Sequence, residues 1–177
     1  MAGPPARGRR KDAGPGPGAI DRPGAWEVAL KLLAVRSRSS HEVWHALGRR
    51  GYPPDEVAAV IARLAACRYL DDAEFARMWV TARAHRAAVG PARLSRELRA
   101  KGIPEGQIAA ALQALAEEWT PAEAAGEAVR RKLKALAGLP PAVARRRLAG
   151  YLERRGFSPE IIIAMCRRHI GGTTDAE

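Results

Sequence analysis

A short motif returns at three nearly evenly spaced places along this 177-residue chain. Each copy consists of a leucine, three further residues, a glycine and a large apolar residue, and the glycines are Gly51, Gly102 and Gly156. The glycines are 51 and 54 residues apart, so the sequence has a regular period. Such a period is typical of repeat proteins, in which each unit is too small to be stable alone and packs on its neighbours.

The residues around each glycine predict two helices joined by a tight turn. Apolar residues stand four positions before each leucine and six positions after each glycine, a spacing that places them on one buried helical face. They are Val43, Leu94 and Leu148 before the leucines, and Val57, Ile108 and Ile162 after the glycines. Glycine suits the left-handed position that ends a helix, and the proline or serine close behind it can start the next one.

A further helix is predicted before each hairpin, at residues 24–35, 72–87 and 121–137. Alanine, leucine and arginine favour helices, whereas only 5% of the residues are aromatic, which is poor material for sheets. We therefore predict an all-α fold of three tandem three-helix repeats that form an elongated, curved helical array. The expected repeats are residues 23–71, 72–120 and 121–170.

The two ends of the chain differ from this body. Residues 1–22 combine glycine, proline and basic side chains with almost nothing to bury, which predicts a disordered basic arm, and residues 171–177 are expected to form a flexible tail. The longest apolar run, Ile161 to Cys166, is too short to span a membrane, and no export signal is expected. Cys67 and Cys166 fall in apolar helical patterns, so we predict buried thiols and a reducing, cytoplasmic location.

One enzyme pattern has to be weighed, because the segment from His41 to His45 reads H-E-x-x-H. In that motif two histidines one turn apart hold zinc and the glutamate activates water. Zinc needs a third protein ligand, yet the next histidine, His85, is far along the chain. Ser39 and Glu42 also fit an S-x-x-E capping box, which explains the glutamate without a metal. We therefore predict no metal site, and a zinc hydrolase remains the alternative.

No other segment carries a catalytic pattern. The sequence lacks the G-x-x-x-x-G-K-[ST] loop of nucleotide hydrolases and the G-x-S-x-G turn of serine hydrolases. The acidic pair Asp71-Asp72 lies where a helix N-cap is expected, and Glu117-Glu118 falls on an exposed turn. We therefore predict a protein that is not an enzyme and uses no cofactor. The tryptophans are expected in the core rather than as base-stacking platforms, at positions Trp26, Trp44, Trp79 and Trp119.

Basic residues carry the clearest functional signal. The chain has 30 Lys and Arg against 19 Asp and Glu, a formal charge of +11 that favours a polyanionic partner over a merely solvated surface. Residues 121–170 contribute +7 to this charge, whereas residues 25–71 and 72–120 contribute +2 and +1. Few polar amides are placed to read bases, so any DNA binding should be independent of sequence. The candidate contacts to a partner protein or DNA are Arg36, Arg38, Arg49, Arg50, Arg83, Lys101, Arg130, Arg131, Lys134, Arg145, Arg146, Arg147, Arg154 and Arg155.

Three segments, in this order, resemble the signatures of the RecX regulatory proteins of bacteria. They run from Ala29 to Val43, from Tyr69 to Ala76 as Tyr-Leu-Asp-Asp-Ala-Glu-Phe-Ala, and from Leu94 to Ile103, with Arg83 and Gly90 between the last two. The resemblance extends over residues 25–170 and is most specific in the middle segment. His41 and His45 are not part of the family pattern.

The resemblance implies three tandem three-helix repeats that bind RecA recombinase filaments in their helical groove. We expect the protein to be a monomer. The resemblance further implies that binding restrains ATP hydrolysis, filament growth and strand exchange, and that the protein also binds single- and double-stranded DNA. An extended, basic, helical chain without catalytic residues agrees with that function. The alternative of another class is a general DNA-binding helical module without a recombinase target.

Overall fold

The structure of the protein is a computed structural model that describes residues 23–170. Over this range it contains helices and no strands, and none of the helices is long and apolar enough to cross a membrane. The predicted arm and tail lie outside the described residues. The helices are α1 (Ala25–Val35), α2 (Ser40–Gly48), α3 (Pro54–Ala66), α4 (Asp72–Ala87), α5 (Pro91–Ala100), α6 (Glu105–Ala116), α7 (Pro121–Leu133), the 3-10 turn η1 (Lys134–Leu136), α8 (Pro141–Arg154) and α9 (Pro159–His169).

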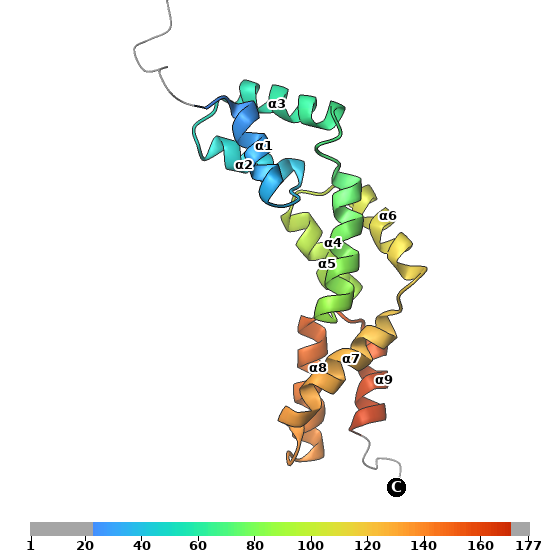
Figure 1. Ribbon diagram of the computed structural model, residues 1–177. Coiled ribbons are helices and arrows are strands. Elements are labelled where there is room, and N and C mark those ends of the chain that lie inside the picture. Colours follow the sequence, from blue (N-terminus) through green and yellow to red (C-terminus); the bar gives the residue numbers. More distant parts are fainter. Residues whose placement is uncertain (1–22, 171–177) are drawn as a thin grey trace, which may run out of the picture.

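The helices follow one another along an elongated molecule (Figure 1). Helices α1–α3 lie at one end, α4–α6 form the middle, and α7–α9 lie at the other end. The prediction of an all-α fold with three tandem three-helix repeats is confirmed. The helix expected at 121–137 differs in detail, because the α-helix ends at Leu133 and the chain tightens into η1 before it turns at Gly138, whose φ is +76°.

Each predicted hairpin turns at its glycine. Gly51, Gly102 and Gly156 have φ values of +77°, +72° and +82°, in the left-handed region where a Cβ is unfavourable. In each turn the N–H of the apolar residue after the glycine donates to the carbonyl of the motif leucine five positions earlier, as from Ile103 to Leu98 at 3.1 Å. This bond closes the helix end in the Schellman manner. The motif is therefore a helix stop signal used three times.

The apolar positions of the motif form the core. All three motif leucines are buried, as are the apolar residues one turn before them and two of the three predicted positions in the following helices, Val57 and Ile108. The third, Ile162, is only half-buried, and Ile163 beside it is 51% exposed. The third repeat therefore keeps apolar surface that the other two bury at the matching position.

Two of the core predictions are wrong. Trp44 is 38% exposed because the buried side of α2 runs through Val43, Ala46 and Leu47 and leaves Trp44 at its edge. Cys67 is exposed because it caps the end of α3, where the chain leaves the helix, whereas Cys166 is buried as predicted. Of the other tryptophans, Trp119 is buried, and Trp26 and Trp79 are half-buried against the cores.

The joint between the first and second repeats is polar. The buried residues of the first repeat form a cluster of their own, separate from the cluster of the other two repeats. Across the joint, the Ser39 hydroxyl donates to the carbonyl of Lys101 at 2.6 Å, and the N–H of Ser40 donates to the Asp72 carboxylate at 2.8 Å. Hydrogen bonds, the ion pair between Lys101 and Glu42 and the close contact of the His41 side chain with Gly102, rather than shared core residues, thus hold these repeats together.

The joint between the second and third repeats is different. Buried residues of both repeats belong to one continuous core, and the two backbones are hydrogen-bonded directly. The N–H of Gly90 donates to the carbonyl of Arg155 at 2.8 Å, and the N–H of Ala92 donates to the carbonyl of Gly156 at 3.3 Å. A Cβ on Gly90 would overlap the Gly156 carbonyl, so the approach requires glycine there. This joint is tightly packed.

Candidate nucleic-acid interface

Several predicted contact residues are engaged within the protein. The Lys101 ammonium lies 2.9 Å from the Glu42 carboxylate and 4.0 Å from the centre of the Trp79 ring, and its side chain is only 15% exposed. The guanidinium of Arg155 donates to the carbonyls of Ala87 and Ala88 and lies over the Tyr151 ring. Lys101 therefore links the second repeat to the first, and Arg155 links the third repeat to the second.

Two carboxylates organise the cations near the joints. Glu42 accepts from Arg36 and from Lys101 on the next repeat, and Glu97 accepts from Arg83, Arg93 and the Trp79 indole. Burial alone would raise the pKa of Glu42, but the bonds from Arg36 and Lys101 outweigh it and lower the pKa to about 2. The bond from Arg83 is the largest cause that lowers the pKa of Glu97, also to about 2.

These pKa values predict an acid-sensitive fold. A carboxylate whose pKa is lowered in the folded state stabilises the fold above its unfolded pKa, and the contribution is lost as pH falls toward the folded pKa. For Glu97 the loss should occur between the ordinary pKa of 4.5 and about 2. We expect Glu97→Gln to destabilise by up to about 3 kcal/mol at pH 7 and to show a smaller loss of stability between these pH values. Urea denaturation across that range measures this, and equal pH profiles for parent and variant would contradict it.

Other candidates are held less tightly. Arg38 donates to the Leu32 carbonyl at 3.1 Å, and Arg50 donates to the Ala46 carbonyl at 2.7 Å. Arg130 and Arg131 both pair with Glu127, and Arg131 also reaches the carbonyl of Arg86 on α4. Exposed pairs of this kind contribute little to stability and can be exchanged for a partner's anion.

The remaining candidates are exposed and form no ion pair with another described residue. They are Arg49, Lys134, Arg145, Arg146, Arg147 and Arg154. All but Arg49 belong to the third repeat, where Lys134 begins η1 and Arg145, Arg146 and Arg147 lie in the middle of α8. The uneven charge found in the sequence thus becomes a local excess of unpaired cations.

Three of these cations share a groove between the end of α7, η1 and α8, which we call the basic groove. Its volume is about 370 Å³, and it is lined by Lys132, Ala135, Leu136, Arg146, Arg147, Gly150 and Arg154. Sequence reasoning missed Lys132, although it continues the basic run of Arg130 and Arg131. Gly150 leaves room for the Arg154 side chain, since a Cβ at this position would come within 3.3 Å of the Arg154 guanidinium.

The chemistry of the basic groove suits phosphate. Its lining, as far as the described residues go, contains four cations and no carboxylate. An arginine guanidinium can donate two parallel hydrogen bonds to two oxygens of one phosphate. A protein whose cations neutralise backbone phosphates also gains affinity for the nucleic acid, because counterions are released. The lining offers neither an aromatic ring on which a base could stack nor a polar amide that could read a base edge. Such a groove can bind a polyanion without reading sequence.

The H-E-x-x-H segment adopts the predicted capping box. The Ser39 hydroxyl accepts from the N–H of Glu42 at 3.1 Å, and the Glu42 carboxylate accepts from the N–H of Ser39 at 3.3 Å. The Nε2 atoms of His41 and His45 lie 2.9 Å apart, and no group of three or more potential metal ligands lies together within residues 23–170. The Glu42 carboxylate forms ion pairs with Arg36 and Lys101. These ion pairs and the capping box give Glu42 a structural role that does not involve activating a water molecule.

We accordingly expect His45→Ala to leave partner binding within about twofold of the parent, because an exposed side chain outside a contact surface contributes little. The purified parent should contain no stoichiometric zinc by elemental analysis. One zinc per chain that is lost in His45→Ala together with function would contradict this prediction.

Three patterns of one protein family match the chain, one for each repeat. The patterns described as the first, second and third three-helix domains of RecX match residues 25–64, 71–112 and 122–164. Each match covers one group of three helices. Together they span most of the described residues.

Whole-chain comparisons agree. The chain is 36% identical over 135 residues to the "Regulatory protein RecX" of Mycobacterium avium, with 76% of this chain and 78% of that protein covered. It is 39% identical over 138 residues to the protein of the same name from Mycolicibacterium smegmatis, with 76% and 73% covered.

Solved structures share the fold. A crystal structure of regulatory protein RecX matches with a TM-score of 0.73 at 22% identity and covers 81% of this chain and 71% of that one. The crystal structure of RecX from Lactobacillus salivarius matches with a TM-score of 0.70 at 20% identity and covers 81% and 93%. With three matching domains in the same order and relatives above 30% identity over most of their length, the chain belongs to the RecX family of regulatory proteins.

Proposed function

We propose that this protein is a non-catalytic regulator that binds RecA recombinase filaments on DNA. Binding restrains their ATP hydrolysis, growth and strand exchange and thereby modulates homologous recombination and DNA repair. Membership of a family of regulatory proteins named RecX supports this function. The elongated stack of repeats also supports it, because an extended array can contact several subunits of a repeating partner.

The observation that carries the nucleic-acid part of the proposal is the basic groove. Its unpaired arginines would contact the phosphates of single- or double-stranded DNA without regard to sequence. The protein would act in the cytoplasm, where it would meet the DNA-bound filament. It would act as a monomer and without a cofactor. The same groove also supports the second candidate function, a general DNA-binding helical module without a recombinase target.

The ATPase of the cognate recombinase tests the proposal. We expect increasing amounts of the protein to lower DNA-dependent ATP hydrolysis by filaments already assembled on single-stranded DNA. Binding to the same DNA is measured without recombinase, and inhibition at protein concentrations that leave bare DNA unoccupied indicates a contact with the filament itself. If ATP hydrolysis falls only where bare DNA is saturated, the protein competes for DNA and the second candidate is correct.

A further inference from the structure

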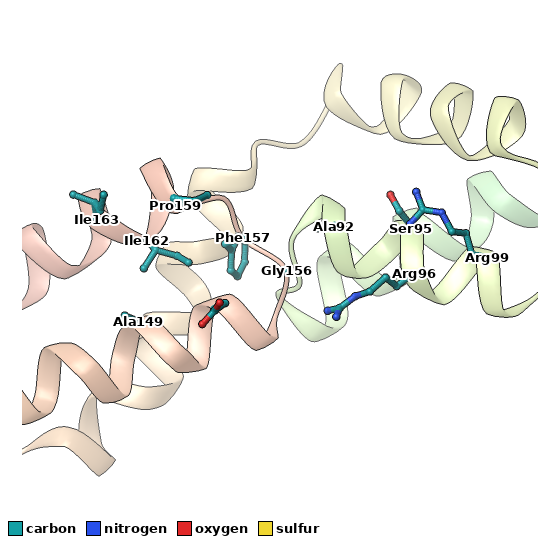
Figure 2. A pocket seen from close by; sticks show the side chains of 11 residues that line it. Ala92, Ser95, Arg96, Arg99, Ala149, Gly156, Phe157, Pro159, Ile162 and Ile163 are labelled. Atoms are coloured by element: carbon teal, nitrogen blue, oxygen red, sulfur yellow. The ribbon is translucent and has the colours of Figure 1, made fainter.

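A second hollow, distinct from the basic groove, lies at the joint between the second and third repeats. We call it the joint cleft. It encloses about 700 Å³ and is lined by Ala92, Ser95, Arg96, Arg99, Ala149, Glu153, Gly156, Phe157, Pro159, Ile162 and Ile163. Figure 2 shows that its labelled residues come from α5 on one side and from α8, α9 and the turn between them on the other.

The two walls of the joint cleft differ in chemistry. The wall of the third repeat is mainly apolar, with the half-buried Ile162 and the 51% exposed Ile163, and it also carries the exposed carboxylate of Glu153 on α8. The facing wall of α5 presents the polar side chains Ser95, Arg96 and Arg99 (Figure 2). Arg96 forms no ion pair with a described residue, and Arg99 is paired only with the exposed Glu105 on α6. The cleft is therefore amphipathic, with cations along one wall.

The joint cleft is already formed in the free protein. Its base is the contact in which the N–H of Ala92 donates to the carbonyl of Gly156, beside the bond from Gly90 to Arg155. A Cβ on Gly156 would overlap the backbone of Arg93, which shows how closely the two repeats approach. A preformed hollow loses little conformational freedom on binding, which favours affinity.

We propose that the joint cleft binds a segment of the partner protein that carries apolar side chains next to carboxylates. The apolar side chains would cover Ile162 and Ile163, and the carboxylates would pair with Arg96 and Arg99. The inference rests on the proposed function and deepens it, because it assigns the protein contact with the filament to this cleft and leaves the DNA contact to the basic groove.

Charge and apolarity together select this occupant. A phosphate backbone could pair with Arg96 and Arg99, but it has no apolar groups to cover Ile163. A purely apolar segment would leave Arg96 without a carboxylate partner, since only Arg99 is already paired, with Glu105. A volume of about 700 Å³ accommodates several side chains, as expected for one face of a short helix or loop.

Two substitutions on opposite walls test the proposal. Ile163→Asp and Arg96→Glu change exposed residues, and the melting temperature of each variant is checked first. The probes are the cognate recombinase filament on single-stranded DNA and the same DNA alone. We expect each variant to bind the filament at least about tenfold more weakly, as when a contact near the centre of an interface is removed, and to bind bare DNA within about twofold of the parent. Ala164→Asp is the matched control, since Ala164 is exposed on α9 next to Ile163 but does not line the cleft.

The outcomes separate the two proposals. A parent that binds filament no better than bare DNA overturns the proposed function. A parent that prefers the filament, with both variants binding as tightly as Ala164→Asp, overturns the assignment of the joint cleft. Equal weakening of filament and bare-DNA binding by Ile163→Asp also overturns it, since the cleft would then belong to the nucleic-acid surface.

Discussion

Replacement of Gly156 by alanine should lower the free energy of unfolding by about 3 to 5 kcal/mol, because two costs add. The φ of Gly156 is +82°, in a region that disfavours any residue with a Cβ. The new methyl group would also overlap backbone atoms of Arg93, so the second and third repeats would have to move apart. Since the core is continuous across this joint, that movement would disturb both repeats.

Gly138→Ala is the control that separates the two costs. Gly138 has a similar φ of +76°, but nothing lies within 4 Å of the position that a Cβ would take. It should therefore lose only about 1 to 2 kcal/mol, from backbone strain alone. Chemical denaturation of both variants, followed by far-ultraviolet circular dichroism, measures the difference. Equal destabilisation would mean that the close approach of the two repeats does not constrain the fold.

The double variant Arg147→Glu and Arg154→Glu should lose about tenfold or more of its affinity for DNA at low salt. Both side chains line the basic groove and form no ion pair with another described residue, so their reversal removes phosphate contacts and leaves the packing intact. Each lost contact should also flatten the dependence of log affinity on log salt by about 0.7 to 0.9. Stability should change by about 0.5 kcal/mol or less for each residue, as for other exposed substitutions. Titration of labelled DNA at several salt concentrations gives both quantities.

A charge-matched control uses Arg86→Glu and Arg167→Glu, two exposed arginines that line neither the basic groove nor the joint cleft. It accounts for the change in net charge and should flatten the salt dependence much less. If both double variants lose affinity equally, DNA responds to overall charge and the groove is not a site. If the Arg147 and Arg154 variant binds bare DNA normally but binds the recombinase filament weakly, the groove contacts acidic side chains of the partner instead.

The local part of the fold could be predicted because its signals lie close together in the sequence. A glycine, the leucine four residues before it and the apolar residue after it determine each hairpin turn. The joint between the second and third repeats has no such signal. Gly90 has an ordinary φ of −85°, and its need to be glycine comes from the carbonyl of Gly156, which is distant in sequence.

The same reason limits prediction of the candidate site. An excess of basic residues in the third repeat is visible in the sequence, but the side chains that are occupied are not. Lys101 pairs with Glu42, 59 positions earlier, and Arg155 reaches carbonyls 67 and 68 positions away. Arg83 pairs with Glu97 across two helices of one repeat. Only the three-dimensional arrangement separates cations that brace the joints from those that remain unpaired.

The two joints differ in how they respond to bending. Between the first and second repeats, opening the angle would exchange the ion pair between Lys101 and Glu42 and a few hydrogen bonds, such as those from Ser39 and Ser40, for contacts with water. Each exchange has a net cost of about 0.5 to 1.5 kcal/mol for a neutral hydrogen bond and about 1.5 to 3 kcal/mol for one to a charged group. Opening the joint between the second and third repeats would expose apolar side chains of the shared core to water. This exposure is unfavourable, and no new interaction with water compensates for it. Changes of curvature along the molecule should therefore concentrate between α3 and α4. The first repeat would then rotate relative to the other two, which would move together as one rigid body.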